Sequence, residues 1–315
     1  MPFLPRLGTC VTLLSLFALP LRAQPATSSS RMDVVHGKPY VMVTVNGKGP
    51  FRFVIDTGTG AQALVTASLA GQLGLPVVGQ ARLTDPSGQG EQRAPITLIQ
   101  SLNVAGVEFT AVQAIEHSLA AEDAACQGLL GFTLFRDYLL TLDYPNHRLA
   151  LAPGALAPDG EHSVLPFRMP DGVPIVPLQI NGRRVEAQLD SGGTGLSLPT
   201  QVAEHLKFAS DPVVFAVGES LSTRFQLMAG RLGSDVRVGR YAFAKPFVEI
   251  NAAFPLANFG GCAMQNFSIT FDQVNHLVRL DSQQTSFHLN EDSTILRLQS
   301  TPQERPRDQA LVPIG

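Results

Sequence analysis

Apolar and polar residues alternate along short segments of this chain, and glycine, proline and asparagine separate the segments. Residues 40–45 alternate, an Asn46-Gly47 pair follows, and a second apolar segment covers residues 51–55. Alternation predicts a half-buried β-strand, and Asn-Gly favours the positive φ angles of a tight hairpin turn. The pattern therefore predicts a β-hairpin that ends immediately before Asp56.

The same pattern occurs a second time in the chain. Residues 175–180 form an apolar segment, Asn181-Gly182 follows, and residues 185–189 lead into Asp190. The turn chemistry again favours a tight hairpin. The sequence thus predicts two equivalent hairpins, each of which ends at an aspartate.

An aspartate, a hydroxyl-bearing residue and a glycine follow each hairpin, at residues 56–58 and 134 residues later at residues 190–192. One such triplet is common by chance, so the flanking sequence matters. Residues 138–151 and 267–280 each predict a strand, a turn and a strand. Leu-Leu-Gly before the first aligns with Asn-Phe-Gly before the second. A repeat of roughly 120 residues exceeds the period of about 20–50 that solenoids use, and it indicates a duplicated lobe.

Few segments of the chain show helical periodicity, and an all-β class is expected. Residues 96–115 and 236–250 predict further hairpins, while residues 61–75 predict a strand and a short helix that ends at Gly74. The polar, glycine-rich residues 84–91 predict a hairpin tip between two strands.

The doubled Asp-Thr/Ser-Gly motif, its apolar strands and the later hydrophobic-hydrophobic-Gly resemble the aspartic peptidases. The nearest are retropepsin-like or pepsin-like members of the single-chain, two-lobe, bacterial secreted type. The resemblance covers about residues 38–152 and 173–282. It implies two pseudo-symmetric retropepsin-like β-barrel lobes, the acid-protease fold, with one aspartate from each lobe at an active site between them.

The resemblance implies an aspartic endopeptidase, and the chemistry follows from two adjacent carboxyl groups. They cannot both ionise cheaply, so the pair shares one proton and titrates as a unit. The charged member takes a proton from water while the protonated member hydrogen-bonds the scissile carbonyl, so no covalent intermediate forms. The expected catalytic residues are Asp56 and Asp190, and the expected active-site loop supports are Thr57, Gly58, Thr59, Ser191, Gly192 and Thr194.

The second copy departs from the family pattern at two positions. Gly193 stands where Thr59 carries the usual hydroxyl in the first copy, and Asn258 replaces the first apolar residue of the hydrophobic-hydrophobic-Gly. These departures keep a second function open, a catalytically silent peptide-binding protein with the same fold. No tyrosine between residues 71 and 116 matches the flap tyrosine of pepsin-type enzymes. Residues 84–91 are the candidate flap, and a solvated hairpin tip without a role is the alternative.

Other interpretations of the same residues are weaker. Structural roles for the two aspartates would suit a single motif better than a matched pair. Ser191 lies in a sequence similar to that of trypsin-like peptidases, but Leu189 takes the place of the usual glycine and no Ala-Ala-His-Cys-like segment precedes it. The glycines at residues 58–60 lack the helix and acidic residue of a dinucleotide site. None of the seven histidines is assigned a catalytic role.

The ends of the chain and the junction between the copies differ in composition from the repeats. Residues 1–23 predict a secretory signal peptide, whose apolar segment is too short to span a bilayer; an unprocessed anchor is the alternative. We expect an exported protein, periplasmic or extracellular, without stable membrane insertion after cleavage. Residues 24–37 predict a flexible lead-in, residues 153–172 a linker, and residues 283–315 a polar tail.

Charge and cysteine content limit the partners. Without residues 1–23 the chain has 21 basic and 26 acidic side chains, a net charge of −5, which disfavours a nucleic-acid partner. Export permits a disulfide between Cys126 and Cys262, but two buried thiols are the favoured prediction, and their spacing fits no metal site. We expect a monomer that takes a peptide or protein substrate and uses no cofactor or metal.

Overall fold

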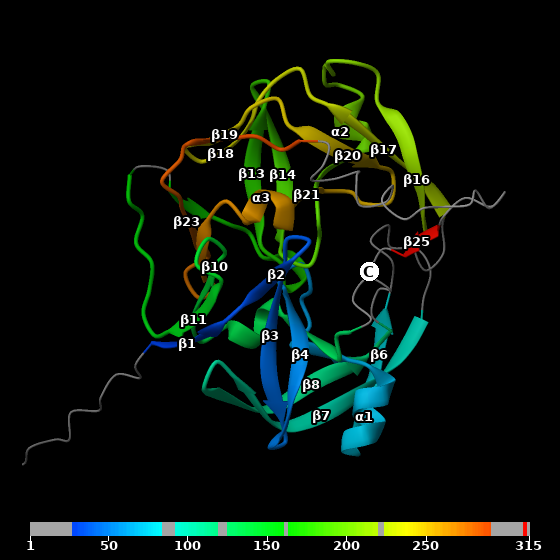
Figure 1. The fold of residues 1–315 in the computed structure, drawn as a ribbon, viewed down its shortest axis with the longest axis vertical. Coiled ribbons are helices and arrows are strands. Elements are labelled where there is room, and N and C mark those ends of the chain that lie inside the picture. Colours follow the sequence, from blue (N-terminus) through cyan, green and yellow to red (C-terminus); the bar gives the residue numbers. More distant parts are fainter. Residues whose placement is uncertain are drawn as a thin grey trace, which may run out of the picture.

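The computed structural model describes residues 27–83, 92–118, 125–160, 163–219, 224–290 and 311–313. These residues form three β-sheets arranged as two lobes and a sheet that the lobes share. In Figure 1 the first lobe lies below the second, and the shared sheet lies at the left. The predicted all-β, two-lobe architecture is confirmed.

The first lobe is an eight-stranded sheet that begins with the predicted hairpin. Its strands are β2 (Asp33–Val35), β3 (Lys38–Val45), β4 (Lys48–Asp56), β5 (Ala63–Val65), β6 (Val77–Leu83), β7 (Gln92–Val104), β8 (Val107–Glu116) and β9 (Gly128–Gly131). Their order is β2-β3-β4-β9-β5-β8-β7-β6, and an additional pairing of β3 with β7 curls the sheet toward a barrel. Asn46 and Gly47 take the expected positive φ angles, 50° and 72°. The predicted helix is α1 (Ala67–Leu73), and it ends at the left-handed Gly74.

The second lobe is an eleven-stranded sheet with an equivalent core. Its strands are β13 (Ile175–Ile180), β14 (Arg183–Asp190), β15 (Leu196–Pro199), β16 (Val213–Glu219), β17 (Arg224–Arg231), β18 (Val236–Val238), β19 (Tyr241–Phe243), β20 (Phe247–Asn251), β21 (Ala257–Gly260), β24 (Ser286–Phe287) and β25 (Leu311–Pro313). Two short helices, α2 (Thr200–Ala203) and α3 (Gly261–Met264), follow β15 and β21. The strand order is β24-β19-β18-β13-β14-β21-β15-β20-β17-β16-β25. The predicted hairpin over 236–250 covers only β18 and β19, because β20 pairs with β15 and β17 instead.

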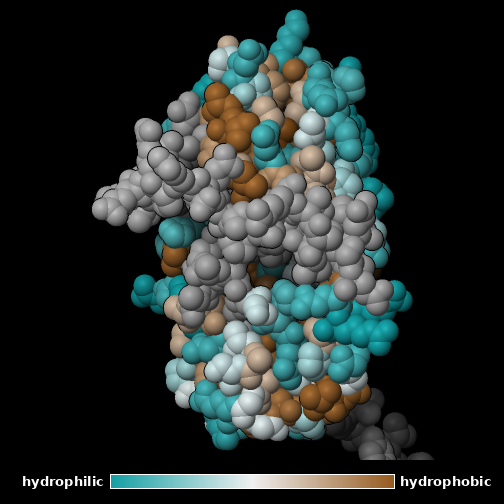
Figure 2. All heavy atoms as spheres, turned by 90° about the vertical axis from the view of Figure 1, so that its right-hand side faces the viewer, coloured by the Kyte–Doolittle hydropathy of each residue, from teal (hydrophilic) through white to brown (hydrophobic). Residues whose placement is uncertain are grey.

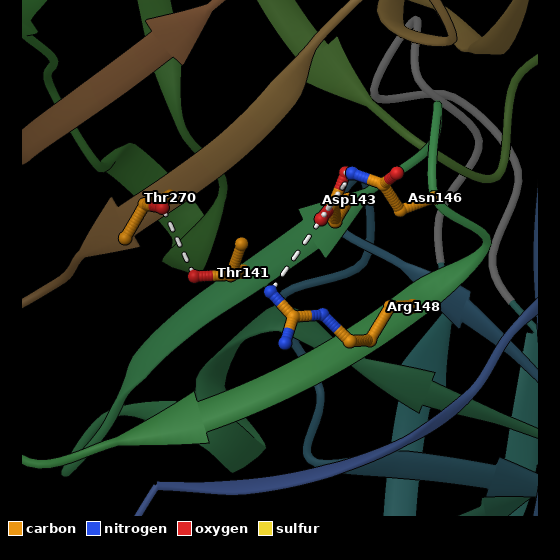
Figure 3. Close-up of polar contacts among 5 residues, drawn as sticks. All are labelled: Thr141, Asp143, Asn146, Arg148 and Thr270. Atoms are coloured by element: carbon orange, nitrogen blue, oxygen red, sulfur yellow. Dashed lines mark hydrogen bonds and ion pairs between the residues drawn. The ribbon is translucent and has the colours of Figure 1, made fainter.

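A six-stranded sheet joins the lobes. Its strands are β1 (Ser28–Arg31), β10 (Leu139–Asp143), β11 (Arg148–Ala152), β12 (Val164–Pro166), β22 (Ser268–Asp272) and β23 (Leu277–Asp281), in the order β1-β11-β10-β22-β23-β12. At its centre β10 of the first copy pairs with β22 of the second, and the hydroxyls of Thr141 and Thr270 lie 2.9 Å apart (Figure 3). Backbone hydrogen bonds therefore run continuously from one lobe to the other.

The turns of this shared sheet repeat as the sequence predicted. Asp143 accepts hydrogen bonds from the Asn146 amide at 3.0 Å and lies 3.6 Å from Arg148 (Figure 3). In the second copy Asp272 accepts from the Asn275 amide at 2.8 Å. An aspartate at the end of a strand and an asparagine three residues later thus hold both turns closed.

Three segments differ from what their composition predicted. Within residues 24–37, expected to be a flexible lead-in, β1 pairs with β11 and β2 pairs with β3. Met32 between them is fully buried, so edge pairing and one apolar anchor order this polar segment. The linker over 153–172 contributes β12 and a short 3₁₀ helix, η3 (Pro170–Gly172). Phe287, in the segment predicted to be a polar tail, is also buried.

Two expectations fall outside the described residues, namely the signal peptide over 1–23 and the candidate flap over 84–91. The strands on either side of the candidate flap do pair, Leu83 with Gln92.

Figure 2 shows the side of the molecule that carries β6 and β16, and apolar residues gather in the upper part of this view. Val213 and Val214 of β16 are among the exposed large apolar residues.

Candidate active site

The two predicted aspartates end equivalent strands of the two lobes. β4 runs parallel to β9 with Asp56 opposite Gly131, and β14 runs parallel to β21 with Asp190 opposite Gly260. The pairing of each aspartate with the glycine of the hydrophobic-hydrophobic-Gly is the same in both lobes. The internal repeat seen in the sequence is therefore also a repeat of strand register.

The two aspartate loops approach each other closely because glycine follows each motif. A Cβ atom added to Gly58 would lie 2.5 Å from Oδ1 of Asp190, and one added to Gly192 would lie 2.4 Å from Cγ of Asp56. Real Cβ atoms do not come so near to a carboxyl group. Each glycine thus leaves the space that the carboxyl group of the other lobe occupies.

Four hydrogen bonds made by two buried hydroxyl residues hold the loops together. The Thr57 amide donates to Ser191 Oγ at 3.0 Å, and the Thr57 hydroxyl donates to the Leu189 carbonyl at 2.6 Å. In the reciprocal direction the Ser191 amide donates to Thr57 Oγ1 at 3.0 Å, and the Ser191 hydroxyl donates to the Ile55 carbonyl at 2.7 Å. Both side chains are fully buried. The contacts are pseudo-symmetric and fix the two lobes in register at the site.

Asp56 accepts two hydrogen bonds from its own loop. The Gly58 amide donates to Oδ1 at 2.7 Å, and the Thr59 hydroxyl donates to Oδ2 at 2.9 Å. The pKa of Asp56 is raised to about 8, chiefly by burial and then by the charge of Asp190, against the lowering effect of the Thr59 and Gly58 hydrogen bonds. The two carboxyl groups interact directly, and the pair therefore holds a proton at neutral pH.

Asp190 accepts three hydrogen bonds from different donors. The backbone amides of Gly192 and Gly193 both donate to Oδ1 at 2.9 Å. The side-chain amide of Asn258 donates to Oδ2 at 2.6 Å from the neighbouring strand β21. Oδ2 of each aspartate thus has a side-chain donor, but the donor differs between the lobes.

The sheet surface beside each aspartate differs in polarity between the lobes. Side chains two residues before the aspartate and at the positions paired with them across the sheet share one face with that aspartate. In the first lobe this row is Val54, Leu129, Leu64 and Ile115. In the second lobe it is Gln188, Asn258, Ser197 and Glu249. The halves of the site therefore offer an apolar wall and a polar wall.

Most of the predicted loop residues lie at the interface between the lobes, but Thr194 has a different contact. Its carbonyl accepts a hydrogen bond from the Cys262 amide at 2.7 Å. Among the described residues the side-chain donor to Asp190 is Asn258. The sequence pattern marks Asn258 only as a departure from the family motif. The signal that could have identified it is the presence of two departures, at residues 193 and 258, in the same copy.

Gln188 is a second residue that the sequence did not single out. Its side-chain amide donates to the Gly58 carbonyl at 2.9 Å and adds a cross-lobe contact that the first copy, with Val54 at the same place, lacks. The alternation of apolar and polar residues along a strand gives no signal that a polar residue at this position is functional.

The two cysteines among the described residues, Cys126 and Cys262, are buried thiols, as the sequence favoured. Cys126 Sγ contacts the carbonyl oxygens of Arg52 and Gly128. Within the part of the chain that the structure describes, no group of three or more His, Cys, Asp or Glu side chains is arranged to bind a metal ion. None of the described helices combines the length and apolar character that crossing a membrane requires.

Comparison with known families agrees with this geometry. A family model described as aspartyl protease matches residues 41–134 and 176–262, one region in each lobe, and the two regions include Asp56 and Asp190. A search of curated proteins finds no significant match. Because the matched regions make up more than half of the chain and coincide with the two structural repeats, the chain belongs to the aspartyl protease family.

Proposed function

We propose that this protein is an aspartic endopeptidase in which Asp56 and Asp190 act on a shared water molecule. The observation that carries the proposal is the pairing of two buried carboxyl groups across the reciprocal Thr57 and Ser191 contacts, and the raised pKa of Asp56 supports it. Two carboxyl groups that share one proton provide a general acid and a general base at the same site.

In this mechanism ionised Asp190 accepts a proton from water, and the water oxygen attacks the scissile carbonyl carbon. Asp56 gives its proton to the carbonyl oxygen, and a neutral tetrahedral diol forms. The diol collapses when Asp190 returns its proton to the leaving nitrogen and one diol hydroxyl returns a proton to Asp56. The C–N bond breaks, a carboxylic acid and an amine leave, and both aspartates regain their initial states.

The second candidate, a silent peptide-binding protein, depended on the departures at Gly193 and Asn258. The hydrogen bond from Asn258 to Asp190 supports an intact site, because the carboxyl group keeps a side-chain donor despite the glycine at 193. We therefore favour the enzyme, and the silent protein is the other outcome of the experiment below.

The setting of this activity is also a proposal. The apolar segment within residues 1–23 supports export to the periplasm or the medium after signal cleavage. One chain supplies both aspartates, which supports a monomer. The excess of acidic side chains supports a peptide or protein substrate over nucleic acid.

The test is cleavage of a mixed peptide library by the purified chain from residue 24 onward, at several pH values from about 3 to 9. Asp56→Asn and Asp190→Asn should each abolish cleavage, because each removes one acid–base partner. Asp281→Asn, at an exposed carboxylate that pairs with Arg279, is the matched control and should retain full activity. A folded wild-type chain that cuts nothing at any pH would leave the binding protein as the function.

A further inference from the structure

The Oδ2 atoms of Asp56 and Asp190 accept hydrogen bonds from chemically different side chains. Thr59 donates its hydroxyl to Asp56 Oδ2 at 2.9 Å, and Asn258 donates its amide to Asp190 Oδ2 at 2.6 Å. The repeat aligns Thr59 with Gly193, and it aligns Asn258 with Leu129. The second lobe has therefore lost the hydroxyl at one position and gained an amide at another.

A side chain at position 193 and the amide of Asn258 cannot both be accommodated, so the glycine and the asparagine depend on each other. A Cβ atom on Gly193 would lie 2.6 Å from Nδ2 of Asn258 and 2.6 Å from Oδ2 of Asp190. A side chain at 193 would therefore displace the Asn258 amide or the carboxyl group. Glycine at 193 is the residue that lets an amide from β21 reach Asp190.

The Asn258 amide interacts with Asp190 in particular. Among the described residues its one hydrogen bond is the donation to Asp190, and its amide oxygen is buried without a partner. Burial of an unsatisfied polar atom costs free energy, and the first lobe avoids that cost with Leu129. The hydrogen bond to Asp190 is thus the contact that offsets the cost of a polar side chain at this position.

The two kinds of donor differ in the protonation state of the carboxyl group with which they can form a hydrogen bond. A hydroxyl can donate to a carboxylate or accept from a carboxylic acid, whereas amide N–H groups only donate. Asp190 is contacted by three such donors, from Gly192, Gly193 and Asn258. Asp56 is contacted by one amide and by a hydroxyl that serves either state. Three N–H donors favour the ionised form of Asp190 more strongly than one amide and one hydroxyl favour the ionised form of Asp56.

We propose that Asn258 is a positioning residue that holds Asp190 as the ionised base of the dyad and so places the shared proton on Asp56. This inference rests on the proposed peptidase function and refines it by giving each aspartate one role. The raised pKa of Asp56 agrees with it.

Other titratable groups near Asp190 do not supply this asymmetry. Asp56 faces it from the first lobe. Tyr144 is buried, and its pKa is raised by burial and by the charges of Asp190 and Asp56, so it stays neutral. Glu249 lies on β20, two strands across from Asn258, where its negative charge opposes rather than favours an ionised Asp190.

The activity test replaces second-lobe residues by their first-lobe counterparts. Asn258→Leu copies Leu129 and should lower kcat about 10–100-fold with little change in KM, because one charge-assisted hydrogen bond is lost at a reacting group. The acid limb of its pH–rate profile should move to higher pH by about one unit. Gly193→Thr alone should also lose activity, through the contact with the Asn258 amide.

A merely structural role for Asn258 would lower thermal stability without moving the acid limb. An unmoved acid limb in a folded Asn258→Leu variant would overturn the inference.

A readout independent of activity separates this inference from the peptidase proposal. Carbon NMR of ¹³C-labelled aspartate carboxyl groups in the full wild-type chain, assigned with Asp56→Asn and Asp190→Asn, reports the two protonation states directly. At neutral pH Asp190 should show a carboxylate shift and Asp56 a carboxylic acid shift. A carboxylic acid shift for Asp190 and a carboxylate shift for Asp56 would overturn the inference even if the enzyme cuts peptides. The expected assignment in a wild-type chain that cuts no peptide would support the inference and contradict the proposed peptidase function.

Discussion

Thr57 and Ser191 show how single residues set the geometry of the site. Each hydroxyl accepts one backbone amide of the other loop and donates to one backbone carbonyl, so both groups use their donor and one acceptor position. A buried hydrogen bond that leaves no group unpaired is worth more than its net contribution of about 1 kcal/mol suggests, because its loss strands a partner. These reciprocal hydrogen bonds explain why the triplet needs a hydroxyl at its second position.

The protonation of Asp56 also affects the stability of the fold. Its pKa is raised in the folded state, so between pH 4 and 8 the folded chain holds a proton that the unfolded chain releases. Stability contributed by this group is present at low pH and is lost as pH rises toward about 8. Asp56→Asn, a neutral near-isostere, should be more stable than wild type by more than about 1 kcal/mol at pH 8.

Melting temperature measured against pH for both proteins checks this prediction. The difference should shrink as the pH approaches 4, where wild-type Asp56 is protonated in both states. The exposed Asp33→Asn variant serves as the control and should follow wild type throughout. Equal stability of Asp56→Asn and wild type at pH 8 would contradict a buried, protonated Asp56.

At the scale of elements, hairpins follow from local chemistry. Asn46-Gly47 and Asn181-Gly182 adopt nearly identical positive φ angles, and the turns that contain His147 and His276 repeat as well. The sequence did not predict β1 and β12, which are edge strands of the shared sheet. Their residues show no alternation of apolar and polar side chains. Their pairing depends on a partner far along the chain, which a local pattern does not encode.

The turn between β22 and β23 supports a prediction about acid stability. Although burial raises the pKa of Asp272, hydrogen bonds from the Asn275 side chain and backbone and from the Leu156 amide lower it overall. A depressed pKa contributes stability that is present above the unfolded value near 4 and is lost as pH falls through the folded value.

Asp272→Asn should therefore destabilise the chain by about 1–2 kcal/mol at pH 6 and by less at pH 3. Urea unfolding at the two pH values measures the difference. Asp281→Asn on the neighbouring exposed strand end is a suitable comparison and should cost little at either pH. A loss that is the same at both pH values would rule out the proposed role of the carboxylate charge.

At the scale of the whole molecule, the shared sheet makes one folding unit of two lobes. β10 and β22 pair across the junction, and Phe132 of the first lobe packs edge-on against Phe271 of β22, with ring centroids 5.1 Å apart. Gln273 adds a hydrogen bond of 2.7 Å to the Phe132 carbonyl. These contacts connect the cores beneath the dyad.

Phe271→Ala should lower the free energy of unfolding by about 3–5 kcal/mol, as expected for a large aromatic side chain removed from a core. Because the ring joins both lobes, we expect calorimetry to show a single transition that shifts as a whole. Val213→Ala, at a strand position that is 59% exposed, is the control and should shift the transition little. Two separate transitions, only one of them displaced, would show that the lobes unfold independently.

The main hairpins, the duplication and the two aspartates could be predicted from the sequence. Periodicity and Asn-Gly chemistry act within a few residues, and a repeated motif is visible without coordinates. The side chain that completes the site follows from the fold alone. Asn258 lies 68 residues from Asp190, and it reaches the carboxyl group because β14 and β21 run parallel in a register that places Gln188 opposite Asn258. Contacts of that kind depend on strand order and register, which many residues set together.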